Sequence, residues 1–124
     1  AFTATLPTGP HCCAKTFPRV KYSEIKCADP GYDPVTGTFT VAAGMAGKYL
    51  VSVTMMTGTA AGHLQLIKNA PPAYVWLYTG NEYDMATQTV CMDLVVGDQV
   101  WVQPTYWAMY LFDVYNTFTV IKFM

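Results

Sequence analysis

Charge is scarce in this sequence. Asp, Glu, Lys and Arg make up 12% of the 124 residues, half of the ~25% that is usual for soluble domains. Because charged side chains cover much of the surface of a monomer, their scarcity indicates that other subunits or a ligand cover part of this surface. The alternative is that Thr, Gln, Asn and Gly supply enough polarity by themselves.

Clusters of basic residues and long hydrophobic runs are also missing. The net charge is −1 and the Lys and Arg residues are scattered, so the sequence has no electrostatic footprint for nucleic acid or for an anionic membrane. The longest apolar stretch is broken by Gly97 and Asp98 and falls short of the ~20 residues of a membrane-spanning helix. We therefore expect no nucleic-acid partner and no membrane insertion.

A catalytic constellation is missing too. The Cys and His residues that could form a nucleophile and base are His11, Cys12, Cys13 and His63. Adjacent residues on an extended segment point in opposite directions, so His11 cannot orient Cys12. No Cys-x-x-Cys spacing indicates a zinc site. The sequence therefore predicts a protein that is not an enzyme.

Helix signals are absent, and strand signals recur about every eight to twelve residues, which is typical of an all-β sandwich or barrel. The expected strands cover residues 2–6, 20–26, 38–41, 49–57, 63–68, 74–78, 87–95, 99–103, 109–112 and 117–123. A chain of this length buries one core, so we expect one domain over residues 1–124. The first residue is Ala1 rather than Met, which indicates a processed or trimmed start.

The strand expected at 49–57 has two different faces. One face carries large apolar side chains and the other mixes apolar side chains with hydroxyls. The first set is Tyr49, Val51, Val53 and Met55, and the second is Leu50, Ser52, Thr54 and Met56. The first set predicts a core face, and the second predicts a face that meets a neighbour.

Tight turns stand directly before two of the strands. In Tyr32-Asp33-Pro34-Val35-Thr36-Gly37-Thr38-Phe39, Pro34 presets φ and Gly37 can take a positive φ. Gly97-Asp98-Gln99-Val100-Trp101-Val102-Gln103 repeats the device, and Thr117-Phe118-Thr119 opens the last strand. Phe39 and Trp101 occupy the first positions expected to be buried after their turns, so both are expected to anchor the core.

The Tyr-Asp-x-x-Thr-Gly-x-Phe and Gly-Asp-x-Val-Trp blocks resemble the globular head of complement component 1q, whose family shares its fold with tumour necrosis factor. The resemblance covers nearly the whole chain. It implies an antiparallel ten-stranded jelly-roll β-sandwich that forms a homotrimer. It also implies a secreted extracellular recognition module, similar to the soluble pattern-recognition heads of innate immunity that bind carbohydrate or other extracellular ligands. Two alternatives stay open: a structural component of an extracellular matrix or mineral-associated assembly, and a cytokine-like receptor ligand.

Two departures from the family pattern are visible. Residues 42–49 lack the usual Pro-Gly-x-Tyr block, which predicts a wider bend. Residues 108–117 keep Asp113 as the sole carboxylate, where the family often has several acidic residues that hold calcium near the trimer apex. The resemblance therefore implies no cofactor, unless Glu82 and Asp84 approach Asp113 and complete a calcium site.

The densest group of aromatic residues lies at 106–115. Stiff amphipathic rings suit sugar stacking and binding surfaces, and nearby polar side chains can add hydrogen bonds. The expected ligand site comprises Tyr106, Trp107, Tyr110, Asp113, Tyr115 and Asn116. The alternative is that half of the rings enter the core and the others pack between subunits.

The four cysteines are Cys12, Cys13, Cys27 and Cys91, an even number that permits disulfides in an extracellular family. A strand over 17–26 would hold Cys13 too far from Cys27 for a bridge. Free, buried thiols that act as small apolar residues are the alternative.

Overall fold

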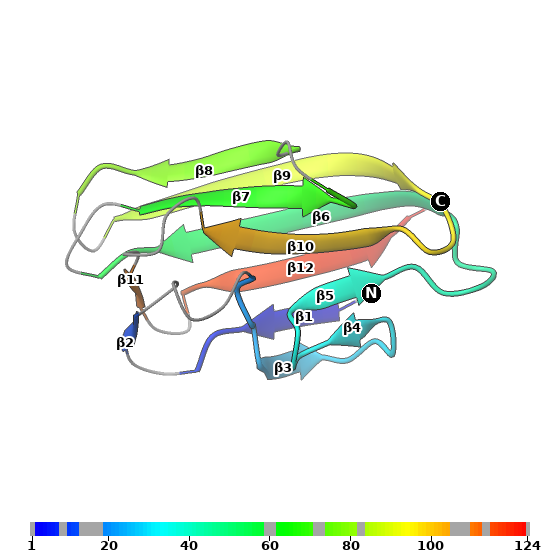
Figure 1. The fold of residues 1–124 in the computed structure, drawn as a ribbon, viewed down its shortest axis with the longest axis horizontal. Coiled ribbons are helices and arrows are strands. Elements are labelled where there is room, and N and C mark those ends of the chain that lie inside the picture. Colours follow the sequence, from blue (N-terminus) through cyan, green and yellow to red (C-terminus); the bar gives the residue numbers. More distant parts are fainter. Residues whose placement is uncertain are drawn as a thin grey trace.

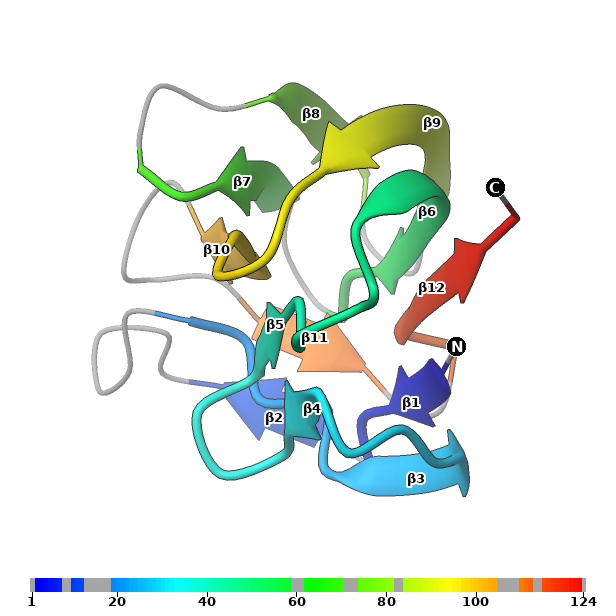
Figure 2. The same cartoon turned by 90° about the vertical axis from the view of Figure 1, so that its right-hand side faces the viewer.

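The computed structural model describes residues 2–7, 10–12, 19–58, 62–70, 74–81, 84–104, 110–112 and 115–123. Two antiparallel sheets of five strands pack face to face (Figure 1; Figure 2). The first sheet has the order β3 (Glu24–Cys27), β1 (Phe2–Thr5), β12 (Thr117–Lys122), β6 (Gly47–Met56) and β9 (Met85–Leu94). The second has the order β4 (Tyr32–Asp33), β5 (Thr38–Thr40), β10 (Gln99–Pro104), β7 (Gly62–Lys68) and β8 (Val75–Thr79). A small pair joins β11 (Tyr110–Phe112) to β2 (Pro10–Cys12).

The expected all-β class is confirmed, and each expected segment overlaps one of these strands. Two short strands, β2 and β4, were not expected. The segment 20–26 is strand only from Glu24 onward. In β6, Tyr49, Val51, Val53 and Met55 are buried, while the side chains between them are exposed or half-buried, as the alternation predicts.

An aromatic cluster fills the space between the sheets. The Phe2 ring stacks on Tyr32 at 4.3 Å between centroids and meets Phe118 edge-on at 5.2 Å. Phe39 contacts both Phe2 and Tyr49. These rings come from both sheets, so they fix how one sheet sits on the other.

The turn before β5 has the expected conformation. Gly37 adopts a φ of 74°, and its N–H donates to the carbonyl oxygen of Asp33 at 2.8 Å. A Cβ at this position would stand 2.2 Å from the carbonyl oxygen of Val20. Glycine is therefore required here for two separate reasons, the backbone conformation and the close approach of another segment.

Phe39 belongs to the main core, as expected, but Trp101 does not. Val100 and Val102 of β10 point into the core, so Trp101, between them, points to the outer side of the second sheet. It is still only 4% exposed. The guanidinium of Arg19 lies 3.8 Å from its ring centroid, and its indole N–H donates to Gln103 Oε1 at 2.7 Å. The expectation of burial is correct and the expected face is wrong.

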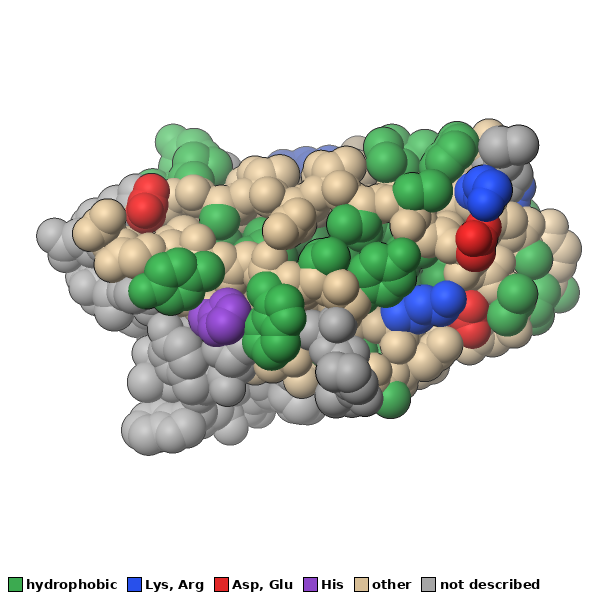
Figure 3. All heavy atoms as spheres, turned by 90° about the horizontal axis from the view of Figure 1, so that it is seen from above, with side chains coloured by type: hydrophobic (Ala, Val, Ile, Leu, Met, Phe, Trp, Pro, Cys, Tyr) green, Lys and Arg blue, Asp and Glu red, His purple; other side chains and the backbone are tan. Residues whose placement is uncertain are grey.

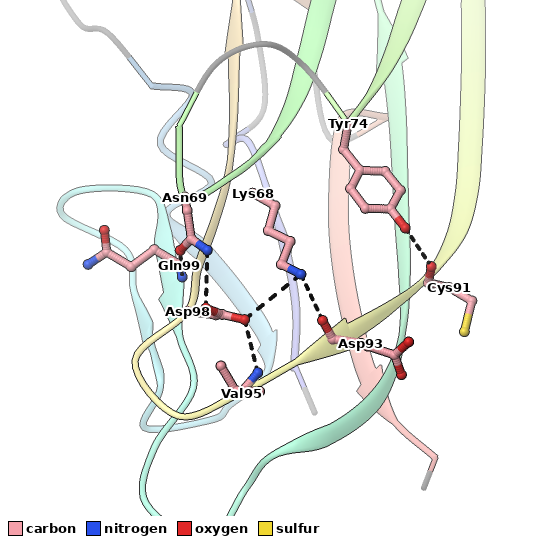
Figure 4. Close-up of polar contacts among 8 residues, drawn as sticks. All are labelled: Lys68, Asn69, Tyr74, Cys91, Asp93, Val95, Asp98 and Gln99. Atoms are coloured by element: carbon pink, nitrogen blue, oxygen red, sulfur yellow. Dashed lines mark hydrogen bonds and ion pairs between the residues drawn. The ribbon is translucent and has the colours of Figure 1, made fainter.

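The Gly97–Asp98 turn is joined to the turn after β7 (Figure 4). The Asp98 carboxylate accepts hydrogen bonds from the Val95 N–H at 2.9 Å and from Asn69 Nδ2 at 3.1 Å. Asn69 in turn accepts from the Gln99 N–H at 2.8 Å, and Lys68 Nζ lies 4.0 Å from Asp98 Oδ2. The hydrogen bond from Val95 is the main reason that the pKa of Asp98 lies below its usual value.

The thiols of Cys27 and Cys91 are free and exposed, so the expectation of buried thiols is wrong for these two. The strand assumed over 17–26 is also shorter than expected, which removes the length argument against a bridge to Cys27. Cys13 lies outside the described residues, and for Cys12 only the backbone is described.

Candidate interaction surfaces

On the outer side of the first sheet, the side chains of β12, β6 and β9 carry no charge over three successive rows. We call these rows the uncharged face. Strand register places the first and third rows across β12, β6 and β9, and the second across β1, β12, β6 and β9. Beyond β12 the register continues the third row through Thr5 to the charged Glu24 of β3, which the uncharged face does not include. The rows are Ile121, Leu50 and Cys91; Thr3, Thr119, Ser52 and Thr89; and Thr117, Thr54 and Thr87.

The hydroxyls of the uncharged face bond to one another. The side-chain oxygens of Ser52 and Thr89 are 3.0 Å apart, as are those of Thr54 and Thr87. Thr3 and Thr119 form a third pair at 3.1 Å. Because each hydroxyl pair already contains a hydrogen bond, covering this surface leaves fewer unsatisfied groups than covering charged or single polar side chains would. The neighbouring Leu50 and Ile121 stay 39% and 43% exposed.

An ion pair marks one end of the uncharged face. Lys48 Nζ lies 2.7 Å from Asp93 Oδ1, in the row next to Leu50 and Cys91. The hydrogen bond from Lys48 lowers the pKa of Asp93 below its usual value. Both side chains are largely exposed, so solvent screens the pair and its effect on stability is small.

Segments of the expected ligand and metal sites meet at the end of β6. The Thr57 N–H donates to the Asp84 carbonyl oxygen at 3.1 Å, and Thr57 forms a β-bridge with Leu111. Thr57 Oγ1 also donates to the Asn81 carbonyl oxygen. The loop that contains Asp84 and the strand that contains Tyr110 therefore approach the same end of the molecule.

The buried Asn116 side chain anchors this end of the molecule to the backbone of β6. Its side chain is 0% exposed, and its amide accepts from the Met56 N–H at 3.0 Å and donates to the Met56 carbonyl oxygen at 3.2 Å. An amide used in this way faces the β6 backbone and has no surface to offer a ligand. Its neighbour Tyr115 is 50% exposed and remains in the candidate site.

The other expected site residues cannot be placed in the same detail. Tyr106, Trp107, Asp113 and Glu82 lie outside the described residues, and Tyr110 is described by its backbone position in β11 alone. Asp84 is exposed, and its carboxylate accepts from the Met85 N–H at 3.0 Å. Within the described part of the chain, no group of three His, Cys, Asp or Glu side chains gathers as a metal site would require.

A further aromatic group lies on the outer side of the second sheet. Trp76 and Tyr78 alternate with the buried Leu77 and Thr79 in β8, and His63 of β7 lies between the two rings. The sequence predicts only a strand for this segment. The alternation of large aromatic and smaller residues in the sequence could have predicted that these rings share one face of the strand. The contact of His63 with the rings could not be predicted in this way, because it depends on the pairing of β7 with β8.

Comparison with known proteins identifies the family. The model of the C1q domain matches residues 1–119, which is nearly the whole chain, so this chain belongs to the C1q domain family. No curated protein sequence matches it.

Solved structures show the same fold at low sequence identity. The globular domain of zebrafish complement 1qA protein has a TM-score of 0.72 and 17% identity, with 99% of this chain and 96% of that chain covered. The Eiger TNF from S. frugiperda has a TM-score of 0.75 and 14% identity, with 100% and 91% covered. Murine APRIL at pH 8.5 has a TM-score of 0.69 and 11% identity, with 98% of each chain covered. The fold is therefore the jelly roll shared by C1q and TNF domains.

Membership defines the general class of the protein. Domains of the C1q and TNF type typically form trimers, are mostly extracellular, bind extracellular ligands or receptors, and are generally non-catalytic. Across the residues that the structure describes, no helix has the length and hydropathy of a membrane span.

Proposed function

We propose that this chain is a secreted, non-catalytic recognition module that acts as a homotrimer and binds carbohydrate or another extracellular ligand. The observation that supports the assembly is the uncharged face, where Leu50 and Ile121 are exposed among paired hydroxyls. Apolar and hydrogen-bonded side chains have a small desolvation penalty. Closed symmetric contacts between copies of one chain are the usual way to cover them.

The proposed ligand site comprises residues 104–116 and 80–84, at the end of the molecule where Asp84 and Leu111 meet Thr57. Tyr106, Trp107, Tyr110 and Tyr115 supply rings for stacking, and Asp113 supplies a hydrogen-bond acceptor. The anchoring of this end by Thr57 and Asn116 supports the proposal, because loops held on a rigid sheet recognise ligands at a lower entropic cost. Three copies in one assembly would add avidity to weak single contacts.

The test is a glycan and microbial-surface binding screen of the protein, made with and without Ca²⁺. A variant with Tyr106→Ala and Trp107→Ala is expected to lose most of the binding while keeping its fold and assembly. Val35→Ala serves as the control, since Val35 is 74% exposed in the turn before β5. Unchanged binding by the double variant would show that these rings only pack, and would make the structural matrix component the better proposal. Binding to a cell-surface receptor without any glycan binding would favour the cytokine-like alternative.

We also propose that calcium contributes little to this protein. Ca²⁺ takes six to eight oxygen ligands, and residues 108–117 offer only the carboxylate of Asp113. Addition of EDTA is expected to shift the melting temperature by less than about 2 °C, which corresponds to a few tenths of a kcal/mol for a domain of this size. A drop of many degrees would show instead that Asp113, Glu82 and Asp84 form a calcium site.

A further inference from the structure

We propose that the outer side of the second sheet carries a second binding site, an aromatic platform for an uncharged saccharide. The aromatic platform comprises His63, Gln65, Trp76 and Tyr78. It shares no residue with the loop site at residues 104–116, and it lies on the opposite side of the sandwich from the uncharged face (Figure 2).

The two rings of the aromatic platform are available to a ligand. Trp76 is 48% exposed and Tyr78 is 63% exposed. They stand two residues apart on the same side of β8, so they are spaced by about 7 Å along the strand. Their exposed faces can therefore stack on successive rings of a short saccharide.

His63 fixes the arrangement of the rings. Its imidazole centroid lies 4.9 Å from that of Trp76, tilted by 36°, and 5.7 Å from that of Tyr78, at 90°. Figure 3 shows the histidine between two hydrophobic side chains at the surface. Since rings that pack against one another lose less freedom on binding, the platform is prepared for a ligand before it arrives.

Polar groups adjoin the rings. Register across β10, β7 and β8 places Gln103, Gln65 and Trp76 in one row, with His63 and Tyr78 opposite each other in another. The side-chain amide of Gln65 makes no hydrogen bond within the described residues. Amides donate and accept, as sugar hydroxyls do, whereas a proline-rich peptide offers mainly acceptors. This pairing of groups favours a polyhydroxylated ligand over such a peptide.

His63, Gln65, Trp76, Tyr78 and Gln103 include no carboxylate, ammonium or guanidinium group, so at the rings an acidic or basic ligand would lose its hydration without gaining an ion pair from these residues. A neutral saccharide incurs no such penalty. The Arg19 guanidinium lies on the same outer side, over Trp101, whose indole N–H bonds to Gln103. The rings therefore favour hexose or N-acetylhexosamine chains, and a sialylated or sulfated chain would have to reach Arg19 to gain an ion pair.

The backbone under the platform is held from the other sheet. Gln88 Nε2 of β9 donates to the Trp76 carbonyl oxygen at 3.1 Å, and the Tyr74 hydroxyl donates to the Cys91 carbonyl oxygen at 3.0 Å. These bonds join the edge strand β8 to β9. They occupy groups that an added β-strand would need, so the exposed side chains are what this edge presents to a partner.

The test titrates the trimer with uncharged oligosaccharides of glucose, galactose, mannose and N-acetylglucosamine while recording the indole N–H signals by NMR. The signal that Trp76→Phe removes is expected to shift on binding, and the signal of the buried Trp101 is expected to stay. Trp76→Ala is expected to weaken binding at least about tenfold with an unchanged melting temperature. The matched control is Val35→Ala, an exposed side chain in the turn before β5, and Tyr115→Ala is measured beside it to report binding at the loop site.

Several outcomes would overturn the proposal. One is that no neutral saccharide binds, or that a proline-rich peptide binds to the platform instead. Another is that Tyr115→Ala abolishes binding whereas Trp76→Ala does not. The last is that Trp76→Ala changes the mass of the assembly, which would make the platform a contact between subunits. The loop site is tested separately by the Tyr106 and Trp107 variant, so failure of one site does not imply failure of the other.

Discussion

Tyr22 is completely buried, and within the described residues its hydroxyl has no hydrogen-bond partner. Burial raises the pKa of this hydroxyl far above its usual value, so the group stays neutral, yet it still loses its hydration. Tyr22→Phe removes the unsatisfied oxygen and keeps the ring against Phe118. We expect the free energy of unfolding to rise by about 1 kcal/mol, measured by urea denaturation. A fall of the same size would show that the hydroxyl has a partner.

Substitutions at Gly37 and Gly44 distinguish the effect of a positive φ from the effect of a steric clash with a Cβ. Both adopt a positive φ, 74° and 79°, so Gly44→Ala is expected to cost about 1 kcal/mol through backbone strain alone. Nothing lies within 4 Å of a Cβ at Gly44, whereas at Gly37 the Val20 carbonyl oxygen is 2.2 Å away. Gly37→Ala must also displace Val20, whose N–H donates to Val102 at 2.7 Å.

We therefore expect Gly37→Ala to lower the free energy of unfolding by at least twice as much as Gly44→Ala, in paired urea denaturations. Equal losses in the two variants would mean that the segment at Val20 yields without cost, and that only the conformation of the turn requires glycine.

The turn between β9 and β10 makes stability depend on pH. Since the pKa of Asp98 is lowered in the folded protein, chiefly by the Val95 N–H, its charged form stabilises the fold above the unfolded pKa of about 3.9. That stabilisation is lost as the pH falls through the lower, folded value. Asp98→Asn is expected to reduce the free energy of unfolding by about 1 kcal/mol at pH 6 and by less at pH 2.5.

Asp93→Asn is the matched control for this change, because the Asp93 carboxylate pairs with the exposed Lys48 and exposed pairs contribute little. The measurement is urea denaturation of both variants and the parent at the two pH values. If the Asp98→Asn deficit were the same at both, the carboxylate charge would not be what joins the turns.

Strands whose residues alternate between apolar and polar could be predicted from the sequence. Short strands that exist only because they pair with another strand could not. β6 alternates clearly along its length. β4 has two residues, and its pairing with β5 is what makes it a strand. β2 pairs with β11, near the other end of the chain. In β10, Val100, Trp101 and Val102 form an unbroken apolar run, so no alternation shows which face Trp101 takes.

The candidate sites follow the same division. The residues at 106–116 could be selected as a candidate site from their density of aromatic rings, whereas the meeting of the Asp84 and Tyr110 segments at Thr57 is a finding of the structure. Asn116 contributes through a contact with Met56, 60 residues away, which no local pattern reveals. Likewise, His63 meets Trp76 and Tyr78 only through the register of β7 with β8.

The molecule as a whole presents two different outer surfaces. The first sheet exposes the uncharged face, with its apolar row and paired hydroxyls. The second sheet exposes the rings of the aromatic platform. In the proposed assembly, the first side would contact other copies while the second side stays open to a ligand, which is the arrangement that avidity requires.

Mass in solution tests the assembly most directly. Light scattering at micromolar concentration should give three times 13.7 kDa, about 41 kDa. Leu50→Asp places a charge in the apolar first row of the uncharged face, on the central strand β6, and should give the monomer mass, because a covered, unpaired carboxylate is costly. Val35→Asp, in an exposed turn, should leave the trimer intact. A parent protein that measured 13.7 kDa, or a Leu50→Asp variant that remained a trimer, would contradict the account.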